Sequence, residues 1–179
     1  MNNTTYSFEN DLAQRFNQIV IKKETGRLIK ILQEIEPSLL DLRLGENSVI
    51  FCDVGAPELL PIYSLGDGIM RLLAVVLCIS SAPNGTIVID EIDTGFHYSS
   101  LKTMWKAVLE SARQYNTQIF ATTHSEDCVK SFSNIELGEL FKSKDVAMYR
   151  IEKSNGTLNS VNYDLETLRA SIESDWETR

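Results

Sequence analysis

Apolar residues recur along this 179-residue chain at two spacings, which predicts a mixture of helices and strands. Helical spacing of three and four residues occurs in residues 7–36, where Gly26 separates two sets, and again in 69–80 and 99–115. Short apolar runs bounded by turn residues predict strands at 39–44, 49–54, 86–91, 118–122, 146–152 and 158–163, and residues 45–47 form a hairpin-type turn between the first two. The pattern therefore predicts an α/β protein.

The order of the central elements predicts a βαβ unit. A buried strand at 86–91 is followed by the amphipathic helix at 99–115 and by a second buried strand at 118–122. Such a crossover joins parallel strands and is right-handed, so the carboxyl ends of both strands should lie at one sheet edge. A short helix at 126–132 and a terminal helix begun by Asp164 complete the prediction.

Composition favours one globular domain over residues 1–179, because 43% of the residues are apolar. Within it we expect a lead-in of helices and strands at 1–60, a core at 61–133, and a hairpin with an Asn155-Gly156 turn plus a helix at 134–179. Acidic residues outnumber basic ones by 25 to 17, and the net charge of -8 argues against general attraction to DNA or to anionic membranes. The three cysteines lack C-x-x-C spacing, and no signal or membrane-spanning pattern is present, so we expect a cytoplasmic protein.

Polar side chains that suit nucleotide hydrolysis follow the two central strands. Asp90 and Glu91 end the first strand, and His124 follows the second. Ligands of open α/β sheets bind at the carboxyl ends of parallel strands. Asp90 could hold Mg²⁺, Glu91 could polarise the attacking water, and His124 could contact the γ-phosphate or orient that water.

A glycine-bearing loop, Ser64-Leu65-Gly66-Asp67-Gly68, opens the apolar helix that precedes these strands. Free amides and the helix dipole favour an anion at such a position. Arg71, in the first turn, is either a second anion contact or a charge on the polar side of the helix. The loop, the acid pair and the histidine are each common without a function, but their occurrence together and in this order favours nucleotide hydrolysis.

Three motifs carry a family resemblance over residues 59–132. S-L-G-D-G-x-x-R-L-L, I-D-E-x-x-x-G-x-H-Y and Q-I-F-A-T-T-H-S resemble the signature loop, Walker B strand and switch histidine of RecF-like and OLD-like bacterial AAA ATPases, which are of the ABC class. The resemblance implies a three-layer P-loop NTPase-like half-domain, in which helices flank a mainly parallel sheet. It also implies ATP and Mg²⁺ as cofactors, and roles in phage defence or DNA repair.

The resemblance further implies an ATP sandwich between two ATPase heads. Ser64, Gly66 and the start of the helix after Gly68 would then contact the γ-phosphate bound by the opposite head, so a homodimer is expected. Leu65 and Asp67 depart from the LSGGQ form of transporters. The stretch 95–98 occupies the place of the dimer-contacting D-loop, with His97 where transporters have aspartate; the alternative is a turn that leads into a helix capped by Ser99.

A phosphate loop of the form G-x-x-x-x-G-K-[ST] is missing from the chain. None of its Lys-Ser or Lys-Thr pairs follows glycine: Lys102-Thr103, Lys130-Ser131, Lys142-Ser143 and Lys153-Ser154. In the resembling proteins this Walker A loop lies upstream, so the chain represents the carboxyl-terminal half of an ATPase head. We expect a Walker A-bearing segment or second polypeptide as partner, and the isolated chain to be inactive.

Three functions stay open at this point. The first is an ATPase module that is completed by a Walker A half and acts with a DNA or nuclease partner. The second is a non-catalytic truncated remnant or an interaction and dimerisation module. The third and weakest is a metal-dependent nuclease that would use Asp90, Glu91, Asp93, His97 and His124.

Overall fold

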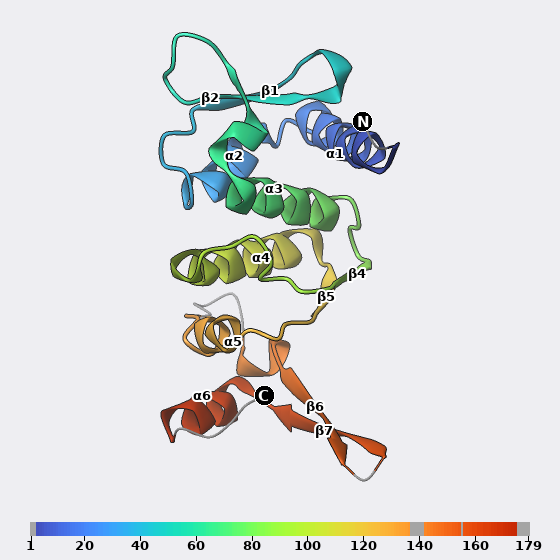
Figure 1. Cartoon of the computed structure of the whole chain (residues 1–179), viewed down its shortest axis with the longest axis vertical. Helices are drawn as coiled ribbons and strands as arrows, with labels where there is room; N and C mark the ends of the chain where they lie inside the picture. Colours follow the sequence, from blue (N-terminus) through green and yellow to red (C-terminus); the bar gives the residue numbers. More distant parts are fainter. Residues whose placement is uncertain (1–2, 137–141, 155, 175–179) are drawn as a thin grey trace. The chain divides into compact units, whose positions relative to one another are not determined.

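A computed structural model describes residues 3–136, 142–154 and 156–174 (Figure 1). The helices are α1 Asn3–Ile21, α2 Thr25–Gln33, α3 Asp67–Ser80, α4 Leu101–Tyr115, α5 Glu126–Ser133 and α6 Leu165–Glu173. The strands are β1 Asp41–Leu44, β2 Ile50–Asp53, β3 Leu60–Pro61, β4 Thr86–Ile89, β5 Gln118–Ala121, β6 Met148–Ser154 and β7 Thr157–Tyr163. Two compact units, Met1–Thr122 and Thr123–Arg179, divide the chain, and each is described by itself. The predicted single domain stays a prediction.

Helix α3 is the centre of the first unit. It contacts α1 and α2 and also packs against α4, beside which it lies (Figure 1). Because it has neighbours on several sides, most of its residues are buried, as its almost wholly apolar sequence requires. The fully buried core side chains include Phe16, Leu32, Leu39, Leu72, Leu73 and Leu77.

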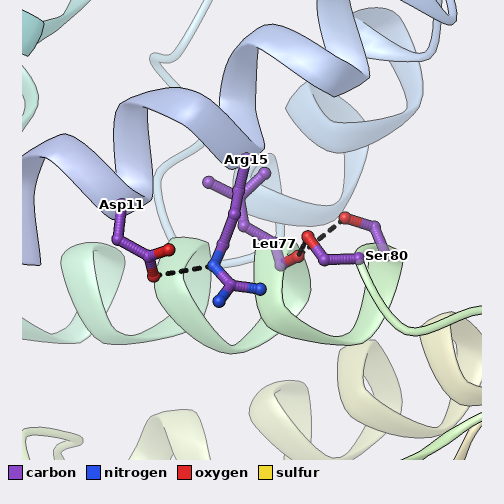
Figure 2. Close-up of polar contacts among 5 residues, drawn as sticks. Asp11, Arg15, Leu77 and Ser80 are labelled. Atoms are coloured by element: carbon purple, nitrogen blue, oxygen red, sulfur yellow. Dashed lines mark hydrogen bonds and ion pairs between the residues drawn. The ribbon is translucent and has the colours of Figure 1, made fainter.

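Polar groups at the end of α3 are satisfied locally. The hydroxyls of Ser80 and Ser81 both donate to the Leu77 carbonyl, at 2.8 and 2.7 Å. Figure 2 shows the Ser80 contact beside the Asp11–Arg15 ion pair of α1, in which Nε and Oδ2 are 2.7 Å apart. Helix α3 ends at Ser80, and β4 begins at Thr86.

The first unit contains the predicted hairpin of β1 and β2. These strands pair antiparallel, with Leu42 opposite Cys52, and the short β3 pairs antiparallel with β2. The helices at the amino terminus are also confirmed, but Gly26 does not separate them. It lies in the first turn of α2, and the chain turns at residues 22–24, where Lys23 has a φ of 60°.

The predicted βαβ unit is confirmed, since β4 and β5 pair parallel on either side of α4. The prediction that both strands are buried is wrong: Val88 is 75% exposed and its neighbour in register, Phe120, is 54% exposed. The expected mainly parallel sheet is also not confirmed. Within the described ranges the other two sheets are antiparallel, and the parallel sheet has two strands, with Val88 and Phe120 exposed on one face.

The second unit has the predicted order of helix, hairpin and helix. Strands β6 and β7 pair antiparallel, and the Asp164 carboxylate caps α6 by accepting from the Thr167 amide at 2.8 Å. Arg169 of α6 donates to the carbonyls of Ser133 and Ile135, at 2.6 and 2.7 Å, and so ties α6 to the end of α5. The Asn155 half of the predicted turn lies outside the described residues. No described helix is both long and apolar enough to cross a membrane.

Candidate functional site

The turn of Asp90 and Glu91 directly follows β4, and both side chains are exposed. Glu91 has a φ of 47°, in the left-handed region that residues other than glycine adopt uncommonly. The Glu91 carboxylate accepts a hydrogen bond from the Thr94 hydroxyl at 3.3 Å, and the Glu91 carbonyl accepts from the Thr94 amide at 3.0 Å. The turn therefore presents two carboxylates to solvent on a fixed backbone.

Thr122, at the end of β5, holds this turn from the neighbouring strand. Its hydroxyl accepts from the Glu91 amide at 3.0 Å and donates to Asp90 Oδ1 at 2.5 Å. The Thr122 amide donates to the Ile89 carbonyl, and the Thr122 carbonyl accepts from the Ile92 amide, both at 3.0 Å. The sequence did not lead us to expect a role for Thr122 at the site, although its position in the T-T-H-S motif indicated one.

Arg71 of α3, which precedes the turn in sequence, also contacts it. Its Nη2 atom donates to the carbonyls of Asp90 and Glu91, at 3.2 and 3.3 Å. Its Nε is buried without a hydrogen-bond partner among the described residues. The predicted role of Arg71 as a second anion contact stays a prediction, and the carbonyl contacts were not expected. They connect the helix opened by the glycine loop to the acidic turn.

The glycine loop lies at the start of α3, with Ser64 and Gly66 exposed. Gly66 precedes the helix and has φ 98° and ψ 172°, a combination that is essentially restricted to glycine. The helix begins at Asp67, two residues before the predicted start at residue 69. Gly68 approaches residues 93–97 closely: a Cβ added there would lie 3.5 Å from the Gly95 carbonyl oxygen. The glycine loop and the turn after the acid pair are therefore neighbours.

His97 has a local structural role in that turn. Its Nδ1 lies 2.9 Å from the Ser99 hydroxyl and accepts from the Ser99 amide at 3.4 Å, which caps the short 3₁₀ turn Tyr98–Ser100. The expectation that Ser99 caps the following helix is wrong, because α4 begins at Leu101 after Ser100, and the His97 cap belongs to the 3₁₀ turn. A contact of His97 across a dimer stays a prediction.

His124 is exposed and follows β5 by three residues. It belongs to the second unit, so its predicted proximity to Asp90 stays a prediction. Its neighbours form a helix start: the Ser125 amide donates to the Thr123 hydroxyl at 3.0 Å, and the Ser125 hydroxyl accepts from the Cys128 amide at 3.2 Å. This start of α5 fixes the backbone on the carboxyl side of His124.

The acidic turn fits Mg²⁺ by its donor chemistry. Mg²⁺ is usually bound through one or two carboxylates together with waters and substrate phosphates, and the exposed Asp90 carboxylate beside a threonine hydroxyl meets that need. Within the described part of the chain, no three His, Cys, Asp or Glu side chains are grouped so that they could hold a metal ion.

Solved structures of SMC ATPase heads are similar to this chain. A structure titled "Structural biochemistry of ATP-driven dimerization and DNA stimulated activation of SMC ATPases" matches with a TM-score of 0.56 and 16% identity, over 90% of this chain and 96% of that one. An SmcHead bound to the C-winged helix domain of ScpA matches with a TM-score of 0.55 and 15% identity, over 82% of this chain and 44% of that one. The fold is that of P-loop NTPase heads.

Two curated proteins are similar in sequence. An "ATP/GTP phosphatase" of Helicobacter pylori is 29% identical over 124 residues, which are 67% of this chain and 32% of that protein. An uncharacterised protein of Methanocaldococcus jannaschii is 32% identical over 65 residues, 36% of this chain and 57% of that protein. The chain thus spans about a third of the length of the first relative and somewhat more than half of the second.

The family comparison covers both the glycine loop and the acidic turn. Residues 4–127 match a family profile described as "AAA domain, putative AbiEii toxin, Type IV TA system". The match takes in most of the chain, and it agrees with the ATPase-head fold and with the ABC-class part of the expected resemblance. The chain belongs to this family of AAA domains.

Proposed function

We propose that this chain is the ATP-binding and hydrolysis module of a RecF-like or OLD-like ATPase of the ABC class. It would supply a signature loop with Ser64 and Gly66, Walker B acids Asp90 and Glu91, and the switch histidine His124. The observation that carries the proposal is the fixed acidic turn, whose backbone is bonded to Thr122 of one strand end and to Arg71 of α3. A merely solvated acid pair would not need contacts from two other segments.

The chemistry of the proposed site depends on charge and position. Asp90 would hold Mg²⁺, and the bound ion would neutralise phosphate charge. The Glu91 carboxylate would accept the proton of the attacking water, and the Thr94 hydroxyl at 3.3 Å would restrict its orientation. His124 would contact the γ-phosphate or orient that water. Phosphoryl transfer needs mainly positioning and electrostatic stabilisation, so these groups suffice once the nucleotide is held.

The glycine loop would act on ATP bound by a second copy. Ser64 and Gly66 are exposed, and the N-cap Gly66 gives α3 no side-chain cap, so the first-turn amides and the positive helix end would favour a phosphate. One of the similar SMC ATPase structures is described by ATP-driven dimerisation. A homodimer closed by ATP is therefore part of the proposal.

The partner of the module would be a Walker A-bearing segment or polypeptide. Such a segment would provide the backbone amides and the lysine that hold the β- and γ-phosphates. Two observations support the need for it: the sequence lacks G-x-x-x-x-G-K-[ST], and the parallel strands β4 and β5 leave Val88 and Phe120 exposed. Parallel sheets are normally covered on both faces.

The second candidate is a non-catalytic remnant or a dimerisation module, and the missing Walker A loop favours it. Under either candidate, the effector pathway would be phage defence or DNA repair, with DNA or a nuclease as further partner.

An ATPase assay with a supplied partner decides between the two candidates. The chain is supplied with a Walker A-bearing segment or polypeptide, and phosphate release is measured with Mg²⁺. We expect turnover that Glu91→Gln lowers about 100-fold or more, because the water loses its base, while bound ATP is retained. Glu110→Gln, which changes an exposed acid of α4, should hydrolyse ATP like the wild type. Absence of Glu91-dependent turnover would refute the ATPase proposal and leave the second candidate.

A further inference from the structure

Thr122 contacts four consecutive residues of the proposed catalytic segment. Its amide and carbonyl bond to Ile89 and Ile92, and its hydroxyl bonds to Asp90 and Glu91. The two main-chain bonds extend the parallel ladder of β4 and β5 past the last strand residues, and any amino acid with a free amide could make them. The two hydroxyl bonds depend on the side chain at position 122.

The two hydroxyl bonds require a group that donates and accepts at once. The Thr122 oxygen accepts from the Glu91 amide at 3.0 Å, and its proton goes to Asp90 Oδ1 at 2.5 Å. A serine hydroxyl has the same capacity, whereas valine, which has the same shape as threonine, has neither a donor nor an acceptor. Thr122→Val therefore removes both hydroxyl bonds with almost no change in the volume of the side chain.

The Thr122 hydroxyl contacts Glu91, whose backbone conformation is an unfavourable one. Glu91 has a φ of 47°, and such conformations persist in residues other than glycine when surrounding contacts hold them. The Glu91 amide is held by Thr122, and the Glu91 carbonyl is held by Arg71 and by the Thr94 amide. Of the groups that make these contacts, the Thr122 hydroxyl is the one that also donates a hydrogen bond to the Asp90 carboxylate.

We propose that Thr122 is the positioning residue of the acid pair: its hydroxyl keeps Glu91 in the left-handed conformation and sets the orientation of the Asp90 carboxylate. The catalytic part of this inference rests on the proposed ATPase function. Thr122 itself touches neither water nor phosphate in this role, and it acts through Asp90 and Glu91. Loss of the hydroxyl should therefore lower kcat and leave the KM for ATP nearly unchanged.

The first test needs no catalysis and uses the 179-residue chain alone. Amide exchange of Glu91 is followed by NMR in the wild type, Thr122→Val and Thr122→Ser. Loss of the acceptor should make exchange of the Glu91 amide roughly 5- to 10-fold faster in Thr122→Val, as expected for one hydrogen bond. Thr122→Ser should exchange like the wild type. The control is Thr86→Val, an exposed threonine at the start of β4, which should not alter the Glu91 amide.

The second test uses the chain complemented by its Walker A-bearing partner. Thr122→Val should lower kcat about 10-fold or more with less than a twofold change in KM, and Thr122→Ser should restore most of the activity. A Thr122→Val chain with wild-type exchange at Glu91, or with wild-type kcat, would overturn the positioning role. If the complemented wild type hydrolyses no ATP, the proposed function fails, and the exchange experiment still decides whether the hydroxyl holds the turn.

Discussion

At the scale of single residues, two backbone conformations define the candidate site. Glu91 adopts a positive φ although it has a side chain, and Gly66 adopts a conformation that is open essentially to glycine alone. The sequence signalled the second, because glycine is the expected residue there, but it could not signal the first. The left-handed Glu91 depends on bonds from Thr122, which is 31 residues away in sequence.

Gly66→Ala should destabilise the chain by about 1–3 kcal/mol, because alanine cannot adopt φ 98° and ψ 172° without strain. Gly26→Ala provides a control of opposite sign. Gly26 lies inside α2 with no atom near the added methyl group, so alanine should stabilise the chain by up to about 1 kcal/mol. Urea unfolding followed by circular dichroism measures both changes. A neutral Gly66→Ala would show that the loop rearranges freely.

At the scale of elements, helices α2 and α4 of the first unit are joined by a half-buried polar contact. The Tyr115 hydroxyl at the end of α4 donates to Glu24 Oε2, just before α2, at 2.6 Å. Burial, and next this bond to Glu24, raise the pKa of Tyr115 well above its usual value. Since the folded pKa exceeds the unfolded one, the contact contributes fully to stability below the unfolded pKa of about 10, and the contribution is lost as the pH rises beyond it.

Tyr115→Phe should therefore change the pH dependence of stability. At pH 7 the variant loses one hydrogen bond, which should lower the free energy of unfolding by about 1 kcal/mol. Between about pH 10 and 11.5 the wild type should lose stability more steeply than Tyr115→Phe, because only the wild type must keep this phenol protonated on folding. Urea unfolding at each pH gives the comparison, with Tyr98→Phe as the control for an exposed phenol. Parallel pH profiles for wild type and Tyr115→Phe would contradict the expectation.

At the scale of the whole molecule, the parallel pair of strands is incomplete as a sheet. Val88 and Phe120 lie opposite each other on β4 and β5 and remain exposed, whereas parallel strands normally have both faces covered. The acidic turn lies at the end of this same pair. A partner that covers the face would therefore also lie near the proposed catalytic residues.

Phe120→Asp should weaken binding of the Walker A-bearing polypeptide at least about 10-fold, because a buried charge would replace a large apolar contact. Titration calorimetry measures the affinity. Leu40→Asp is the matched control: Leu40 is a similarly exposed apolar residue of the first unit, but it lies just before β1 and not on the parallel strands, so its replacement should leave the affinity unchanged. Equal affinity of Phe120→Asp and the wild type would show that the partner docks elsewhere.

The sequence by itself determined the elements of this protein and the order of its motifs. Apolar spacing marked the helices from α1 to α6, the β1–β2 and β6–β7 pairs, and the parallel β4–β5 unit, because these features depend on local periodicity and on short connections. It also placed the glycine loop and the acid pair at the ends of their elements. These are properties that neighbours in sequence decide.

The tertiary structure alone decided which groups hold the acid pair and which faces stay open. Thr122 and Arg71 reach Asp90 and Glu91 from segments that are distant in sequence, and His97 caps the 3₁₀ turn Tyr98–Ser100. The expected burial of β4 and β5 was wrong for a related reason. An apolar strand indicates that a covering layer is needed, but the presence of that layer depends on which segments pack against the strand, and periodicity contains no information about them.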